Sequence, residues 1–180
     1  MTAGNFARAL RLVLEHEGGF SDHPQDPGGA TMKGVTQRVY DAYRAGRGLA
    51  TRSVRGIANS ELNAIYKAQY WNAVRGDALP SGVDFATFDY AVNSGPGRAV
   101  KDLQRGLGCR VDGIVGVATL EASRIADDHR LINDLCDRRL RFLKSLKTWK
   151  TFGRGWEERV RGVRQAALSM VQGDEPVVAA

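Results

Sequence analysis

Three carboxylates near the N-terminus have a spacing that suits hydrolysis of a glycosidic bond. Glu17 follows an apolar repeat, and Asp22 and Asp26 lie in the turn-rich segment after it. Such hydrolysis needs one carboxylic acid to protonate the leaving oxygen and, in most families, a second carboxylate that activates water or acts as nucleophile. We take Glu17 as the candidate acid and Asp26 as the preferred second carboxylate. Asp22 stays open as the alternative, because an Asp in such a segment often caps its own turn.

A helix must position Glu17. Apolar residues recur three and four apart from Phe6 to Leu14, which predicts one buried helical face that ends at the Gly-Gly pair after Glu17. Because a helix C-terminus and apolar neighbours both disfavour a charged carboxylate, this position suits a proton donor. Glycines after it leave the carboxyl approachable by a sugar ring.

The segment 21–36 combines prolines, glycines and aspartates, which predicts ordered turns or a short hairpin. We expect this segment to bring Asp22 and Asp26 back toward the helix end. Thr31 lies farther along it, and its hydroxyl is a candidate for holding the attacking water.

Most of the remaining chain is predicted to be helical. Helical patterns bounded by Gly, Pro or Ser occur in QRVYDAYRAG, in SELNAIYKAQYWNAV after the possible N-cap Ser60, in GVDFATFDYAVNSG, GRAVKDLQRGLG and GVATLEASRIAD, and in DHRLINDLCDRRLRFLKSLK and GWEERVRGVRQAALSMVQ. The last residues, GDEPVVAA, have no periodicity, and we expect a flexible tail over 173–180.

Composition bounds the class of protein. The 180 residues, 43% hydrophobic and 26% charged, indicate a globular chain with one substantial core. A net charge of +6 favours a polyanionic partner such as an acidic cell envelope or nucleic acid, but no nucleic-acid motif accompanies it. We expect neither a signal peptide nor a transmembrane segment. Cys109 and Cys136 fit neither a disulfide framework nor a zinc site.

The run HEGGFSDHPQDPGGATMKGVT resembles the signature of glycoside hydrolase family 108, a group of phage and prophage N-acetylmuramidases. Glu17 falls on that family's catalytic glutamate. The resemblance continues in YKAQYW and FDYAVNSG, and residues 99–122, AVKDLQRGLGCRVDGIVGVATLEA, resemble the peptidoglycan-binding region attached to these enzymes. The order Glu17, Asp26, Thr31 is also similar to the Glu, Asp, Thr order of another group of phage lysozymes, with Thr31 one residue closer to Asp26.

The resemblance implies an all-α (mainly α), lysozyme-like two-lobed helical fold with a short turn or hairpin segment after the first helix. It implies a catalytic lobe over 1–94 and a helical peptidoglycan-binding-like region over 95–172, packed together as one compact unit. The expected activity is that of a peptidoglycan-degrading muramidase, a phage endolysin that hydrolyses the β-1,4 bond between N-acetylmuramic acid and N-acetylglucosamine. Synthesis in the host cytoplasm, action at the cell wall after release, and a monomer are expected. No cofactor or metal is implied.

Four further residues are candidates for binding substrate. Phe20 stands where the family has tyrosine, so an aromatic wall remains without the hydroxyl. Tyr70 and Trp71 suit stacking on sugar faces, although aromatic residues at helical spacing also pack cores. The amide of Asn93 suits an N-acetyl group, although Asn before Ser-Gly also ends helices.

Several alternatives stay open. His16 and His23 flank the carboxylates, but their spacing matches no metal motif. A lytic transglycosylase also needs a single acid, and a noncatalytic wall-binding module would need none. Retention and inversion are both compatible with the sequence; we favour inversion, with Asp26 and Thr31 positioning water. Basic residues in the last two predicted helices suit electrostatic contact with an anionic envelope.

Overall fold

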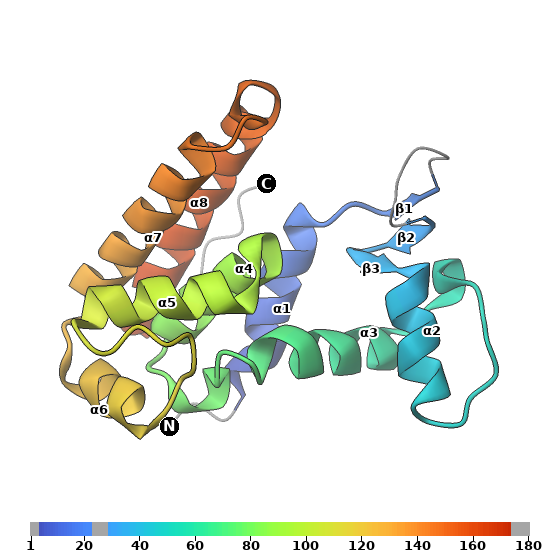
Figure 1. Ribbon diagram of the computed structural model, residues 1–180, viewed down its shortest axis with the longest axis horizontal. Coiled ribbons are helices and arrows are strands. Elements are labelled where there is room, and N and C mark those ends of the chain that lie inside the picture. The colour runs from blue at the N-terminus through green and yellow to red at the C-terminus, as the bar shows by residue number, and fades with distance from the viewer. Residues whose placement is uncertain (1–3, 23–28, 174–180) are drawn as a thin grey trace. The chain divides into compact units, whose positions relative to one another are not determined.

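A computed structural model describes residues 4–22 and 29–173, and most of these residues are helical (Figure 1). The α-helices are α1 (Asn5–His16), α2 (Gln37–Ala45), α3 (Asn59–Tyr66), α4 (Val83–Ser94), α5 (Pro96–Leu107), α6 (Val117–Ile125), α7 (Asp128–Lys144) and α8 (Trp149–Val171). A small antiparallel sheet of β1 (Phe20–Ser21), β2 (Thr31–Met32) and β3 (Val35–Thr36) follows α1. The predicted mainly α, lysozyme-like fold and the hairpin after the first helix are confirmed.

The chain forms two compact units. One contains residues 10–69, and the other contains residues 1–9 together with 70–180. Helix α1 contributes its first turns to the second unit and the rest to the first. This division falls earlier in the chain than the predicted domain boundary between 94 and 95.

Two networks organise the unit of residues 10–69. Thr36 ends β3 and caps α2 by accepting a hydrogen bond from the backbone N–H of Val39 at 3.3 Å. Helices α2 and α3 are joined by Glu61, whose carboxylate accepts from the hydroxyl of Tyr40 at 2.6 Å and pairs with Arg44. The hydrogen bond from Tyr40 lowers the pKa of Glu61.

Helices α4 to α8 form the core of the other unit, with α7 and α8 side by side (Figure 1). Asp89 on α4 is fully buried and pairs with Arg139 on α7 at 2.7 Å and with Arg159 on α8 at 3.0 Å. Burial alone would raise the pKa of this carboxyl, but the two guanidinium groups lower it to about 2. Three helices thus meet at one ionised aspartate.

A second cluster of hydrogen bonds fixes the loop between α5 and α6. The side chain of Gln104 donates to Asp112 Oδ1 at 2.8 Å and accepts from the backbone N–H of Gly113 at 2.8 Å. Asp112 in turn accepts from the backbone N–H of Ile114 at 2.9 Å, which closes an Asx turn. Gln104 and Asp112 therefore hold the loop together.

Two predicted helix starts were wrong. Helix α3 is capped at Ala58, with Glu61 accepting from the backbone N–H of Ala58 at 3.1 Å, so Ser60 lies inside the helix. Helix α8 begins at Trp149 although Gly153 and Gly155 suggested a later start. Gly153 is needed there, because a Cβ at this position would lie 2.6 Å from the indole of Trp149.

Both cysteines are free: Cys136 is buried and Cys109 half-buried. Burial raises the pKa of the Cys136 thiol to about 11, as expected of an inert core thiol. Within residues 4–22 and 29–173, no helix combines the length and the apolar character that crossing a membrane would require.

Candidate active site

Glu17 directly follows the last residue of α1, as predicted. Its backbone N–H still donates to the carbonyl of Leu14 at 3.3 Å, so the residue continues the last helical turn. On the helix before it, Ala9, Leu10 and Val13 are buried, whereas Glu17 is half-buried. The buried face of α1 therefore anchors a carboxyl that keeps partial access to solvent.

The turn between β2 and β3 lies against this carboxyl. Lys33 and Gly34 form the two-residue turn with φ angles of 48° and 77°, and Met32 pairs with Val35 on either side of it. A Cβ built on Gly34 would lie 2.9 Å from Glu17 Oε2 and 2.5 Å from the hydroxyl of Tyr66. Only a residue without a side chain fits between these two groups.

Tyr66, the last residue of α3, brings a phenol to the same place. Its side chain is 2% exposed, and its hydroxyl donates to the backbone carbonyl of Lys33 at 2.8 Å. The hydroxyl and Glu17 Oε2 both lie within 3 Å of one point above Gly34. Tyr66 thus ties α3 to the turn that borders the carboxyl.

Three predicted site residues lie in or beside the small sheet. Phe20 in β1 is half-buried, and the guanidinium of Arg55 lies over its ring at 4.4 Å, so a cation covers one face. Asp22 follows β1 and is exposed. Thr31 in β2 pairs with Ser21, and its hydroxyl donates to the carbonyl of Gly29 at 3.0 Å. Glu17, Phe20, Asp22 and Thr31 all belong to the unit of residues 10–69.

Asp26, the preferred second carboxylate, lies outside the described residues, as does His23. Among the residues that are described, no three His, Cys, Asp or Glu side chains come together as a metal site.

The aromatic pair Tyr70 and Trp71 divides between two environments. Trp71 is fully buried, packs against Phe6 and Phe88 in tilted and edge-to-face contacts with ring centroids 5.5 and 5.3 Å away, and donates its indole N–H to Asp77 at 2.9 Å. No face of this indole is open to a sugar. Trp71 is therefore a core residue, which was the alternative to a role in stacking on sugars. Tyr70 is half-buried.

Asn93 lies in the last turn of α4 and is half-buried. Its amide oxygen accepts from the hydroxyl of Ser94 at 2.9 Å. The helix itself ends at Gly95, whose φ of 89° supplies the left-handed backbone that stops it. The amide of Asn93 is therefore not what ends the helix.

Sequence reasoning missed Gly34 and Tyr66. The glycine in MKGVT suits the positive φ that a two-residue hairpin turn requires, and this is the signal that could have located Gly34. Tyr66 stands first in YKAQYW, beside the two aromatic residues that were chosen instead.

Comparisons with known proteins place the chain in a family. The model of the family described as glycosyl hydrolase 108 matches residues 10–95, and that of a predicted peptidoglycan domain matches residues 98–161. The solved structure of Brucella abortus SagA is 47% identical, covers 94% of this chain and 97% of its own, and superposes with a TM-score of 0.82. No curated protein matches the sequence significantly.

A glycoside hydrolase domain followed by a peptidoglycan domain defines a peptidoglycan-acting hydrolase. The chain belongs to the glycosyl hydrolase 108 family.

Proposed function

We propose that this protein is an N-acetylmuramidase that hydrolyses the β-1,4 bond between N-acetylmuramic acid and N-acetylglucosamine, with Glu17 as the general acid. The observation that carries the proposal is the Glu17 carboxyl, half-buried at the end of α1 and bordered by the Gly34 turn and Tyr66. This site lies inside the segment that matches the hydrolase family.

In the proposed reaction, Glu17 gives its proton to the glycosidic oxygen while the bond from that oxygen to C1 of N-acetylmuramic acid breaks. Water adds to C1, and a second carboxylate accepts the proton that the water loses. Asp26 is our preferred second carboxylate and Asp22 the alternative. The Thr31 hydroxyl donates its hydrogen bond to the carbonyl of Gly29. Its oxygen lone pairs can therefore accept a hydrogen bond from that water.

This arrangement corresponds to inversion at C1. A carboxylate acting as nucleophile would give retention instead, through a covalent glycosyl intermediate. The anomeric form of the first product, followed by NMR before mutarotation, distinguishes the two courses. Comparing Asp26→Asn with Asp22→Asn then identifies the second carboxylate as the residue whose loss is the more damaging.

Substrate contacts are proposed for Phe20, Tyr70 and Asn93. Each is half-buried, so each keeps surface for a ligand. Phe20 and Tyr70 would stack on sugar rings, and the amide nitrogen of Asn93 would donate to an N-acetyl carbonyl. Trp71 is left out of this set because its indole is fully buried.

The decisive experiment compares Glu17→Gln with the wild type on purified peptidoglycan, measuring released reducing ends. We expect a loss of about 100-fold or more, the usual contribution of a general acid. Glu15→Gln is the matched control, because Glu15 lies on the same helix and is exposed. Unchanged cleavage by folded Glu17→Gln would refute the assignment.

Mass spectrometry of the products separates the hydrolase from its closest rival. A reducing N-acetylmuramic acid end supports hydrolysis, whereas a 1,6-anhydro end would identify a lytic transglycosylase. Wall binding without any cleavage by the wild type would identify a noncatalytic binding module.

We further propose that the protein acts as a phage-type endolysin, as a monomer, on the cell wall after its release from the cytoplasm. Hydrolysis of peptidoglycan suits this role. The test is expression in a Gram-negative host with and without an added export signal, with Glu17→Gln as control. Lysis that requires both export and Glu17 is expected.

A further inference from the structure

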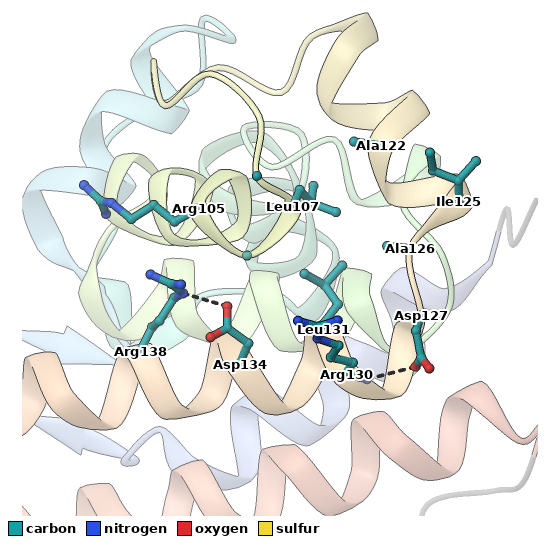
Figure 2. Close-up of a pocket in the computed structure, with 12 residues that line it drawn as sticks. Arg105, Leu107, Ala122, Ile125, Ala126, Asp127, Arg130, Leu131, Asp134 and Arg138 are labelled. Atoms are coloured by element: carbon teal, nitrogen blue, oxygen red, sulfur yellow. Dashed lines mark hydrogen bonds and ion pairs between the residues drawn. The ribbon is translucent and has the colours of Figure 1, made fainter.

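A pocket of about 580 Å³ lies entirely within the region matched by the peptidoglycan domain. It is formed by the end of α5, the end of α6 and the first half of α7 (Figure 2). Its volume falls in the range of sites that bind small ligands, roughly 300–1,000 Å³. All of these elements belong to the same compact unit.

The lining of the pocket is aliphatic and charged. Leu107, Leu131, Ala122 and Ile125 supply apolar surface, and Ile125 is 88% exposed at the rim. None of the described residues that line the pocket is aromatic. Because sugar rings are commonly held by stacking on aromatic side chains, this lining suits a peptide with small apolar groups better than a glycan.

One cation at the pocket is available to a ligand. Asp134 is four residues after Arg130, a spacing that favours a helical ion pair, but its carboxylate accepts from Arg138 at 2.6 Å instead. Arg105 likewise pairs with Asp102 at 2.6 Å. Among the described residues, no side chain is paired with the exposed guanidinium of Arg130, one of the pocket residues drawn in Figure 2.

Arg130 also occupies an unfavourable place for a cation. It lies in the first turn of α7, where the helix macrodipole is positive, and its backbone N–H donates to the N-cap Asp127 at 3.0 Å. A basic side chain there does not stabilise the helix through the dipole. Because Asp127 and Asp128 already offset the positive helix end, the attraction for an anionic ligand comes from the guanidinium of Arg130.

We propose that this pocket binds the peptide stem of peptidoglycan, with Arg130 pairing with a stem carboxylate and the aliphatic lining contacting the alanine methyl groups. The stem has both features, since it contains alanines as well as free carboxylates. The inference rests on the proposed activity only in taking peptidoglycan as the ligand. Hydrolysis at Glu17 and stem binding at Arg130 would then be separate contacts with one polymer.

The test is binding of a free tetrapeptide stem to the full chain, measured by calorimetry and by backbone NMR shifts. This probe has no glycosidic bond, so binding does not depend on hydrolysis. We expect Arg130→Gln to weaken binding about tenfold or more, because it removes a charge-assisted hydrogen bond. Arg161→Gln is the matched control: Arg161 is exposed on α8, outside the pocket, and should bind the peptide as the wild type does.

Ile125→Ser is a second variant, chosen because this exposed side chain can be changed without disturbing the core. It should weaken binding several-fold with an unchanged circular dichroism spectrum. Absence of peptide binding by the wild type, or equal binding by Arg130→Gln, overturns the proposal. So do NMR shifts at the pocket with chitooligosaccharide but not with the peptide, since they would make it a glycan site.

Failure of the proposed hydrolase activity gives a different result. In that case the wild type releases no reducing ends, yet Arg130-dependent peptide binding persists and the pocket assignment stands. Conversely, reducing-end release without peptide binding refutes the pocket and leaves the muramidase intact.

Discussion

Glu17 has no free space on the side of the β2–β3 turn, because Gly34 brings the backbone against its carboxyl. The φ of 77° at Gly34 already favours glycine. In addition, Glu17 Oε2 and the Tyr66 hydroxyl lie too close to leave room for a Cβ at this residue. Two separate requirements therefore select glycine at this residue. The positive φ is required by the turn, and the lack of room for a Cβ is imposed by the site.

Gly34→Ala should reduce both activity and stability. The left-handed backbone costs an alanine about 1–2 kcal/mol, and the contacts with Glu17 and Tyr66 must also shift. Gly48→Ala isolates the first effect, because Gly48 has a φ of 66° and open space around its Cβ position. Urea unfolding and reducing-end release of both variants are the measurements. We expect a similar backbone cost in both and lost cleavage only in Gly34→Ala.

Adding Tyr66→Phe to Gly34→Ala removes the closest contact, the hydroxyl that lies 2.5 Å from the place the alanine methyl would take. Part of the lost activity should return in the double variant. If Gly34→Ala cleaves as fast as Gly48→Ala, the turn does not position the acid.

The sequence predicted Glu17 at a helix end, but it could not show which aromatic residues adjoin the carboxyl. Tyr66 ends α3, and residues 67–71 continue it as a π-helical turn. This turn changes the spacing of side chains around the axis, so a 3.6-residue period cannot say which of Tyr66, Tyr70 and Trp71 is buried. Only the fold shows that Trp71 is core and that Tyr66 adjoins the acid.

At the scale of elements, three helices converge on Asp89. Its partners Arg139 and Arg159 are 2% and 10% exposed, so both guanidinium groups are held beside this carboxylate with little access to water. Removing one partner of a buried ion pair leaves an uncompensated charge, which costs more than the pair itself contributes.

Asp89→Asn should therefore lower the free energy of unfolding by about 3–5 kcal/mol at pH 7. Asp137→Asn is the control, since Asp137 also pairs with an arginine, Arg164, but is 58% exposed and should cost about 1 kcal/mol or less. Denaturant unfolding of the two variants measures the difference. Equal losses would show that burial does not set the strength of the Asp89 pairs.

The helices were most predictable where an apolar period agrees with Gly and Pro boundaries, as in α5 between Pro96 and Gly108. The start of α8 was not predictable, because Gly153 normally indicates a break. Its actual role is to make room for the indole of Trp149, which lies four residues earlier in the same helix. The Asp89 pairs were equally hidden, since they join residues 50 and 70 positions apart.

At the scale of the whole chain, the net charge of +6 should contribute to binding of the cell wall. We expect binding of Glu17→Gln to isolated walls to weaken as NaCl rises from about 50 to about 300 mM, because salt screens exposed charges. A pull-down at several salt concentrations measures it. Binding that does not change with salt would show that the excess charge is not used.

Stability of the unit that contains α4 should depend on pH through Asp84. This carboxyl is buried and accepts from Asn5 Nδ2 at 2.8 Å and from the backbone N–H groups of Gly82 and Phe85. Burial raises its pKa from 3.8 to about 6. Between these values the folded protein holds a proton that the unfolded chain has released, so the free energy of unfolding falls as pH rises from about 4 to 6 and is constant above.

The size of this fall is on the order of 2–3 kcal/mol, and Asp84→Asn should abolish it. Asparagine stays neutral, its carbonyl can still accept from Gly82 and Phe85, and the Asn5 amide can turn to face it. Urea unfolding of both proteins at about pH 4.5 and about pH 7 tests this. The difference between their free energies of unfolding at each pH cancels the contribution of the titratable groups that they share. Relative to the wild type, the variant should gain stability at the higher pH. A difference in the free energy of unfolding that does not change with pH would show that Asp84 is not the group that titrates.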